Sequence, residues 1–343
     1  MAISTTSYSP KEFMFLIAEQ DRFGTLEGAS DNAYHAVDVD SISTPSLNPT
    51  QALDVRTGSR VLQAKDFFQD VIGSVKEISV SGTATTAVLD LLLENIMEES
   101  VGDASGIYTV TSQSNTTSIG TGDSGGDVAG KILSIVIKSG KSDSDLSFRD
   151  CVCTSLTLNG DVGTEGGRIK FSATFQSGST VVDLSDDTTA VDTHFESQHN
   201  YFMSSWVAGY RQIDGIADLV LNSFSCTVEN PASFQGLAST GYEVISRAGE
   251  ISATLDATVK YDATSEPFFA NFNAQTNNAS TAAAATILNH QAALANGAFG
   301  ISMPLTFLTN VALNEGDVMM LDLSVKAVGS GISSATALVE IAC

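Results

Sequence analysis

Alternating apolar and polar residues between Cys151 and Gly178 predict an antiparallel hairpin. The apolar positions are Val152, Leu156 and Leu158 in a first segment and Ile169, Phe171, Ala173 and Phe175 in a second. A period of two is typical of half-buried strands. The stretch 159–167 between the segments is rich in Asn, Asp and Gly, which supply the positive φ angles of a turn. The pattern therefore favours two strands joined by a glycine-rich connection.

The same pattern returns near the C-terminus, with an apolar segment at 307–313, a turn at 314–317 and a strand at 318–327. Each of these hairpins is preceded by a strand and then a helix. A strand at 75–84 leads into a helix at 85–97 with an apolar stripe, and a strand at 249–261 leads into a short helix at 265–272. Because this order occurs twice, we infer a duplicated domain.

The predicted fold class is mainly β, with two tandem antiparallel β-barrel or sandwich domains, each with a flanking α-helix, plus a long arm and loops. We expect a strand and extended arm at 1–60, a first β domain at 61–180, a linker or insertion at 181–215 and a second β domain at 216–343. Within the second domain, the alanine-rich residues 282–294 suggest a weak helix.

Composition narrows the function. The 343 residues include 40 acidic and 16 basic residues, so the formal net charge is −24. This balance disfavours a surface that grips nucleic acid. It suits a soluble protein, cation binding, or a wall along which another polyanion passes without adhering. The start of the chain has no signal-peptide pattern and no apolar run approaches bilayer length, which predicts cytoplasmic synthesis and no membrane association.

No motif indicates catalysis or a cofactor. The sequence contains no P-loop, dinucleotide fingerprint or HExxH pattern, and its four histidines are scattered. An acidic loop at 183–199, which includes His194 and His199, could bind a metal ion, but its spacing matches no known pattern and favours a solvated loop. The pair Cys151 and Cys153 lacks further ligands nearby, so reduced thiols are the simpler interpretation. We expect neither an enzyme nor a metalloprotein.

Three segments resemble the major tail tube proteins of long-tailed bacteriophages. They are Phe148–Leu158 (F-R-D-C-V-C-T-S-L-T-L) with its continuation to Phe175, Leu221–Asn230 (L-N-S-F-S-C-T-V-E-N) with its continuation to 249–261, and Asp21–Thr25 (D-R-F-G-T) before a long arm. The resemblance implies a virion tail component, assembled in the host cytoplasm, whose rings stack into a tube lined by β-strands. It also implies contacts with tail tip, tape-measure and tail-terminator proteins, and passage of genomic DNA without specific binding.

The resemblance further implies where the contacts lie. A duplicated chain can form a homotrimeric, pseudo-hexameric ring, and the alternative is a ring of six chains. The candidate lumen residues are Lys131, Ile135, Lys170, Ser172, Thr174, Thr254, Asp256, Thr258, Asp322 and Ser324. The candidate residues of an inter-ring arm are Arg22, Phe23, Asp38, Asp40 and Arg56.

Two other functions fit the same pattern. A β-sandwich adhesin or carbohydrate-binding module on a virion or cell surface would need an exposed aromatic patch. A secretion-system tube would share both the fold and the rings.

Overall fold

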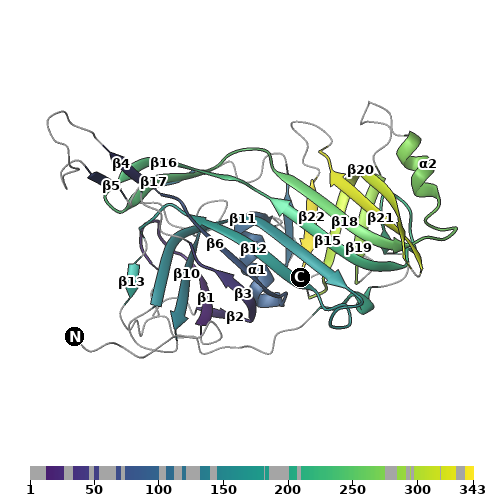
Figure 1. Ribbon diagram of the computed structural model, residues 1–343, viewed down its shortest axis with the longest axis horizontal. Helices are drawn as coiled ribbons and strands as arrows, with labels where there is room; N and C mark the ends of the chain where they lie inside the picture. The colour runs from purple at the N-terminus through teal and green to yellow at the C-terminus, as the bar shows by residue number, and fades with distance from the viewer. Residues whose placement is uncertain are drawn as a thin grey trace.

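The computed structural model is built mainly of antiparallel strands (Figure 1). It describes residues 13–26, 34–45, 50–53, 67–70, 74–99, 106–111, 118–120, 132–139, 145–180, 182–184, 201–206, 210–274, 284–290, 294, 297–316, 318–329 and 337–343.

Seventeen strands form one sheet. In the first half of the chain they are β1 (Phe13–Glu19), β2 (His35–Val37), β3 (Val39–Ser43), β6 (Lys76–Thr83), β7 (Glu98–Glu99), β8 (Ile107–Val110), β10 (Leu133–Ser139), β11 (Asp145–Asp161), β12 (Lys170–Ser177) and β13 (Val182–Leu184). In the second half they are β14 (Arg211–Gln212), β15 (Leu221–Glu229), β18 (Ser252–Lys260), β19 (Ala284–Asn289), β20 (Gly300–Glu315), β21 (Met319–Ala327) and β22 (Val339–Ala342).

Smaller elements complete the fold. The hairpin of β16 (Ala232–Ala238) and β17 (Gly241–Arg247) pairs with β9 (Ser118–Gly120) and projects along the first half of the chain (Figure 1). A separate pair consists of β4 (Thr50–Leu53) and β5 (Phe67–Asp70). The helices are α1 (Thr86–Ile96), α2 (Pro267–Ala274) and a 3-10 turn at Met203–Ser205.

The two halves meet along β11. Its residues Ser155–Asn159 pair with β12 on one edge, and Ser155–Asp161 pair with β15 on the other. The strand order β3–β6–β12–β11 of the first half therefore continues as β15–β18–β21–β20 of the second. The prediction of a mainly antiparallel β protein is confirmed. No closed barrel is observed among the described residues, and the two expected units share a sheet.

The second half repeats the pairing of the first. Strands β10, β12 and β13 pair with β11 as β19, β21 and β22 pair with β20. The register irregularities repeat as well. Those of the first half lie at Val39/Ser41, Leu133/Ile135 and Cys153/Ser155, and those of the second at Leu221/Ser223, Ala284/Thr286 and Leu308/Asn310.

A side-chain contact at one of these bulges is also repeated. Thr154 Oγ1 donates a hydrogen bond to the carbonyl oxygen of Thr174 (3.3 Å), and Thr309 Oγ1 donates one to that of Ser324 (3.1 Å). Thr154 and Thr309 are the extra residues of their bulges, on β11 and β20. Aligning the bulges makes β11 correspond to β20, β12 to β21, β6 to β18 and β3 to β15.

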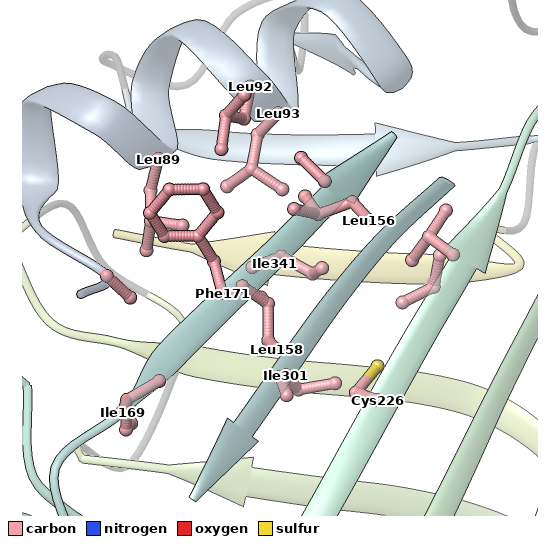
Figure 2. Packing of buried hydrophobic residues seen from close by; sticks show 14 of the residues in the cluster. Leu89, Leu92, Leu93, Leu156, Leu158, Ile169, Phe171, Cys226, Ile301 and Ile341 are labelled. Atoms are coloured by element: carbon pink, nitrogen blue, oxygen red, sulfur yellow. The ribbon is translucent and has the colours of Figure 1, made fainter. Parts of the chain in front are cut away.

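Helix α1 covers the apolar face of this sheet. Thr85 precedes it in an extended conformation, as expected for an N-cap, although its hydroxyl makes no capping hydrogen bond. Figure 2 shows the buried leucines of the helix facing Leu156 on β11 and Phe171 on β12. Ile301 of β20 and Ile341 of β22 belong to the same cluster, so both halves of the chain contribute to one core.

Two expectations from the sequence were wrong. Residues 35–43, expected in the arm, form β2 and β3, which join the sheet by pairing with β1 and β6. Ala36 and Val37 are neighbours on β2, so they point to opposite faces, and both are buried, in two different clusters. The alanine-rich segment expected to be a weak helix contains β19 instead. Pairing with β14 and β20 on its two edges overrides the helical propensity of alanine.

Arg247, at the end of β17, forms hydrogen bonds to both halves of the chain. Its Nη1 donates to the carbonyl oxygens of Cys153 and Asn230, each at 2.7 Å, and its Nη2 donates to that of Asn95 at 2.7 Å. These carbonyls belong to the β11 bulge, the end of β15 and the last turn of α1. Burial lowers the pKa of Arg247 to about 10, still far above neutrality, so the side chain remains charged.

We expect Arg247→Lys to lower the free energy of unfolding by roughly 1–3 kcal/mol, because lysine cannot direct forked donors at three carbonyls and leaves some unsatisfied. Urea denaturation followed by circular dichroism measures the change. Arg22→Lys, at an exposed position, is the matched control and should leave the midpoint unchanged. Equal midpoints for both variants would show that the forked contact is dispensable.

Candidate functional site: the polar face of the sheet

Small polar side chains cover one face of the sheet from β3 to β20. Directly paired residues form rows that cross the strands, and we call these rows the polar face. The first row is Ser41, Ser81, Ser172, Thr157, Thr227, Thr254 and Lys326. The second is Ser43, Ser79, Thr174, Ser155, Glu229 and Ser252. The third is Lys170, Asn159, Ser225, Asp256, Ser324 and Asn310.

Hydroxyl groups pair across the strands within these rows. Thr157 and Thr227 are joined at 2.9 Å across the junction of the two halves, and Ser41 and Ser81 at 2.8 Å near β3. Such cross-strand pairs stabilise a sheet while leaving its polar face in water. The residues between them in sequence, such as Leu156 and Leu158, point to the core. The alternation therefore makes one continuous face that is polar and one that is apolar.

Carboxylates gather on this face near the junction of the two halves of the chain. Asp161, Asp256 and Asp322 line an open depression of about 630 Å³. Asp256 accepts a hydrogen bond from Ser324 Oγ at 2.5 Å, and Asp322 accepts one from Thr258 Oγ1 at 2.8 Å. Hydroxyl donors hold Asp256 and Asp322 in place without neutralising them. Arg168 and Lys170 also line the depression, so its charged residues are three carboxylates and two cations.

The lysines of the face are paired with acidic groups. Lys170 Nζ lies 2.9 Å from both Asp40 and Glu165, and these two hydrogen bonds raise its pKa. Lys326 Nζ lies 3.1 Å from Glu250. These exposed pairs contribute little to stability. They do offset the positive charges, which leaves the polar face with a negative balance.

Most of the lumen residues suggested by the sequence come together here. Eight of them share this face: Lys170, Ser172, Thr174, Thr254, Asp256, Thr258, Asp322 and Ser324. Ile135 does not, because both faces of β10 are covered and its side chain is fully buried. Lys131 lies outside the described residues. The sequence reasoning named no residue of β3, β6, β11 or β15 as a lumen candidate, although alternating Ser and Thr residues on these strands belong to the same face.

The suggested arm residues do not form one surface. Arg22 and Asp38 are exposed, and Asp40 is bound to Lys170. Phe23 is only 8% exposed and packs with Ile132, Val152 and Ile245. Its side chain is therefore part of the core and not available for a contact with another copy. Arg56 lies outside the described residues.

A buried polar network explains why the turn at 21–25 lies against the sheet. The carboxylate of Asp150 accepts hydrogen bonds from Gln20 Nε2 (2.6 Å), Gly24 N (2.7 Å) and Ser179 Oγ (2.5 Å). Arg149 Nη1 donates to the carbonyl oxygen of Gly24 at 2.9 Å. Asp150 has a φ of 54°, which directs its side chain inward from β11. The network ties the start of the chain to the strand that joins the two halves.

The four cysteines are reduced and buried. Burial raises the pKa of Cys153 and of Cys226 to about 12, so both remain protonated thiols.

Within the described residues no cluster of His, Cys, Asp and Glu could hold a metal ion. The expected acidic loop falls outside those residues apart from Asp183 and Leu184, which lie in β13. In the same described part of the chain, no helix is long and apolar enough to span a membrane.

The family described as phage tail tube protein matches residues 14–327, nearly the whole chain. The chain belongs to this family. Membership of the phage tail tube family identifies a structural component of the virion tail and confirms the resemblance seen in the sequence. A search of curated proteins found no match.

The Asp150 network yields a stability prediction. We expect Asp150→Asn to lower the free energy of unfolding by roughly 1–3 kcal/mol, because an amide accepts fewer of the three buried donors while tolerating the same φ. Chemical denaturation measures the loss, and faster amide hydrogen exchange at Gly24 would locate it. Asp161→Asn, at the exposed end of β11, is the control. An unchanged exchange rate at Gly24 would contradict the anchoring role.

Proposed function

We propose that copies of this tail tube protein close into rings, that the rings stack into a tube, and that the polar face lines the channel. The observation that supports this most directly is the continuity of the polar face through both halves of the chain. A face of eight strands with hydroxyl rows on one side and the core on the other is suited to surround water. Its outer strands, β3 and β20, have edges without a partner among the described strands, which pairing with another copy would satisfy.

We favour three chains per ring over six. Each chain contains the pairing pattern twice, so three chains would place six similar units around one axis. The alternative is six full chains, with one half of each chain outside the channel. That arrangement would leave half of the hydroxyl rows away from the lumen.

The chemistry of the polar face suits the passage of genomic DNA. Phosphates bind where lysine and arginine side chains are free to release counterions. Here the lysines are paired with carboxylates, and Asp161, Asp256 and Asp322 add negative charge. Such a wall repels the DNA backbone at short range, and short hydroxyl side chains offer little to grip. In the tail, the tube would also contact the tail tip, tape-measure and tail-terminator proteins.

The two alternatives are less well supported. A carbohydrate-binding module needs exposed aromatic rings, but the aromatic residue that lines the depression, Phe224, is only 3% exposed. A secretion-system tube would share the ring geometry, but the family match favours a phage tail.

Ring formation is tested by negative-stain microscopy of the purified chain at increasing concentration. We expect rings and stacked tubes, and native mass spectrometry should give three chains per ring. Six chains per ring would exclude the trimer, and a monomer at every concentration would overturn the assembly.

The charge of the lumen is tested by Ser172→Arg, which adds a cation to the first hydroxyl row. We expect tubes that co-sediment with short duplex DNA at low salt and release it as salt increases, whereas wild-type tubes should retain little. Leu237→Arg, on the projecting hairpin, is the control with the same added charge. Equal retention by both variants would show that the polar face does not line the channel.

A further inference from the structure

One edge of β20 has no partner in the described part of the chain. Thr306 pairs with both β19 and β21, which therefore lie on opposite edges. Beyond Thr306, β21 continues to Glu315 on one edge, while β19 contributes no further pair on the other. In the first half, β15 occupies the corresponding edge of β11. The edge of β20 that corresponds to the β15-paired edge of β11 therefore has no partner in the described part of the chain.

Strand β3 presents the complementary edge. It pairs with β6 on one side, as β15 pairs with β18. On its other side β15 pairs with β11, whereas β3 has no further partner among the described strands. Because β3 corresponds to β15 and β20 corresponds to β11, the two unpaired edges match the two sides of the internal β11–β15 junction.

The exposure of corresponding residues supports this match. Leu158 on β11 is 1% exposed, but its counterpart on β20, Leu313, is 44% exposed. Phe224 on β15 is 3% exposed, and its counterpart on β3, Ile42, is only half-buried. A leucine 44% exposed near the end of a strand, at a position where the other unit buries one, indicates a missing neighbour.

We infer that β3 of a second copy pairs antiparallel with β20, in the register of the internal junction. Asp161 faces Ser223 and Asn159 faces Ser225 within the chain, so Gly316 faces Ser41, and Asn314 faces Ser43, between chains. The second pair even keeps the same residue types, Asn opposite Ser. This inference rests on the proposed ring and names the edges that close it.

Two features set the length of the contact. The counterpart of Thr227 is Pro45, which has no N–H to donate, so regular pairing ends before it. Helix α2 contacts β20, as α1 contacts β11. Since α1 does not prevent β15 from pairing with β11, α2 is not expected to prevent β3 from pairing with β20. The junction between chains is therefore open to β3 but shorter than the seven pairs within the chain, Ser155–Asp161 with Ser223–Glu229. Because the joined edges are different, successive copies follow head to tail and can close into a ring.

Disulfide cross-linking tests the register. Directly opposed Cα atoms in an antiparallel pair lie about 4.5–5.5 Å apart, within the range that a disulfide bridges. We expect Ser43→Cys/Asn314→Cys to convert oxidised rings into covalent oligomers on a non-reducing gel, with loss of the monomer band. The native cysteines are buried and should not contribute. Asn159→Cys/Ser225→Cys, opposed within one chain, verifies that oxidation is efficient.

The matched control is Ser41→Cys/Asn310→Cys, which uses the same strands and the same face in a wrong register. Its cysteines would be separated by about 20 Å along the strand, and the monomer band should persist. Rings that form normally but cross-link in neither pair, or in the control pair instead, would overturn this register while leaving the proposed function intact. Absence of rings in the unmodified chain would overturn the proposed function itself.

A second measurement does not depend on introduced cysteines. Leu313→Glu should abolish ring formation while leaving the circular dichroism spectrum of the monomer unchanged, because the side chain is half exposed there. Leu237→Glu, at 53% exposure on the hairpin, should assemble like the wild type. Normal rings from Leu313→Glu would contradict the role of the β20 edge.

Discussion

Backbone hydrogen bonding on both edges of β11 is the constraint on which the rest of the structure depends. The first part of this strand pairs with β10 and the second with β15, and the bulge at Thr154 separates the two. An unpaired strand edge is costly when buried and invites association when exposed. The pairing with β15 satisfies one such edge inside the chain. The corresponding edges of β3 and β20 have no partner among the described strands, and these are the edges that we propose pair with other copies.

The sheet that results has two chemically distinct faces. On one face, α1 and the strands around Ile341 exclude water from a core shared by both halves. On the other, polar residues alternate with core residues in the eight strands from β3 to β20. A small hydroxyl can satisfy its hydrogen bonds with the opposite strand, as Thr157 and Thr227 do, and projects little into the space above the sheet. The same alternation thus gives stability to one face and a smooth, hydrated surface to the other.

Local patterns in the sequence were sufficient to predict many of the strands and both α-helices. Period-two alternation located β12, β18 and β21, and with them eight of the ten suggested lumen residues. The apolar stripe located α1, and the short helix predicted at 265–272 overlaps α2 (Pro267–Ala274). These features depend on neighbours in the sequence, which is why they could be predicted.

Other features depend on partners distant in the sequence. Strand β3 contains Asp40 at its bulge and precedes Pro45, so its sequence is typical of a loop, and only pairing with β6 makes it a strand. Ile135 was a lumen candidate because its strand was expected to have one polar face, but β10 is covered on both faces. The junction of β11 with β15 leaves no local pattern, because both of its strands already alternate for their own halves. The expected domain boundaries accordingly stay predictions, since a shared sheet offers no gap at which to place them.

The duplication also permits differences between the two units. Ser79 and Ser172 of the first unit correspond to Asp256 and Asp322 of the second, so two of the three carboxylates of the depression have hydroxyl counterparts. In the proposed ring of three chains, acidic and hydroxyl sectors would therefore alternate around the channel. A single-unit protein could only repeat one sector six times, with all of the self-repulsion that six acidic clusters create. In that proposed ring, joining two units in one chain would let the lumen keep a negative potential while each acidic cluster is flanked by hydroxyl-bearing neighbours.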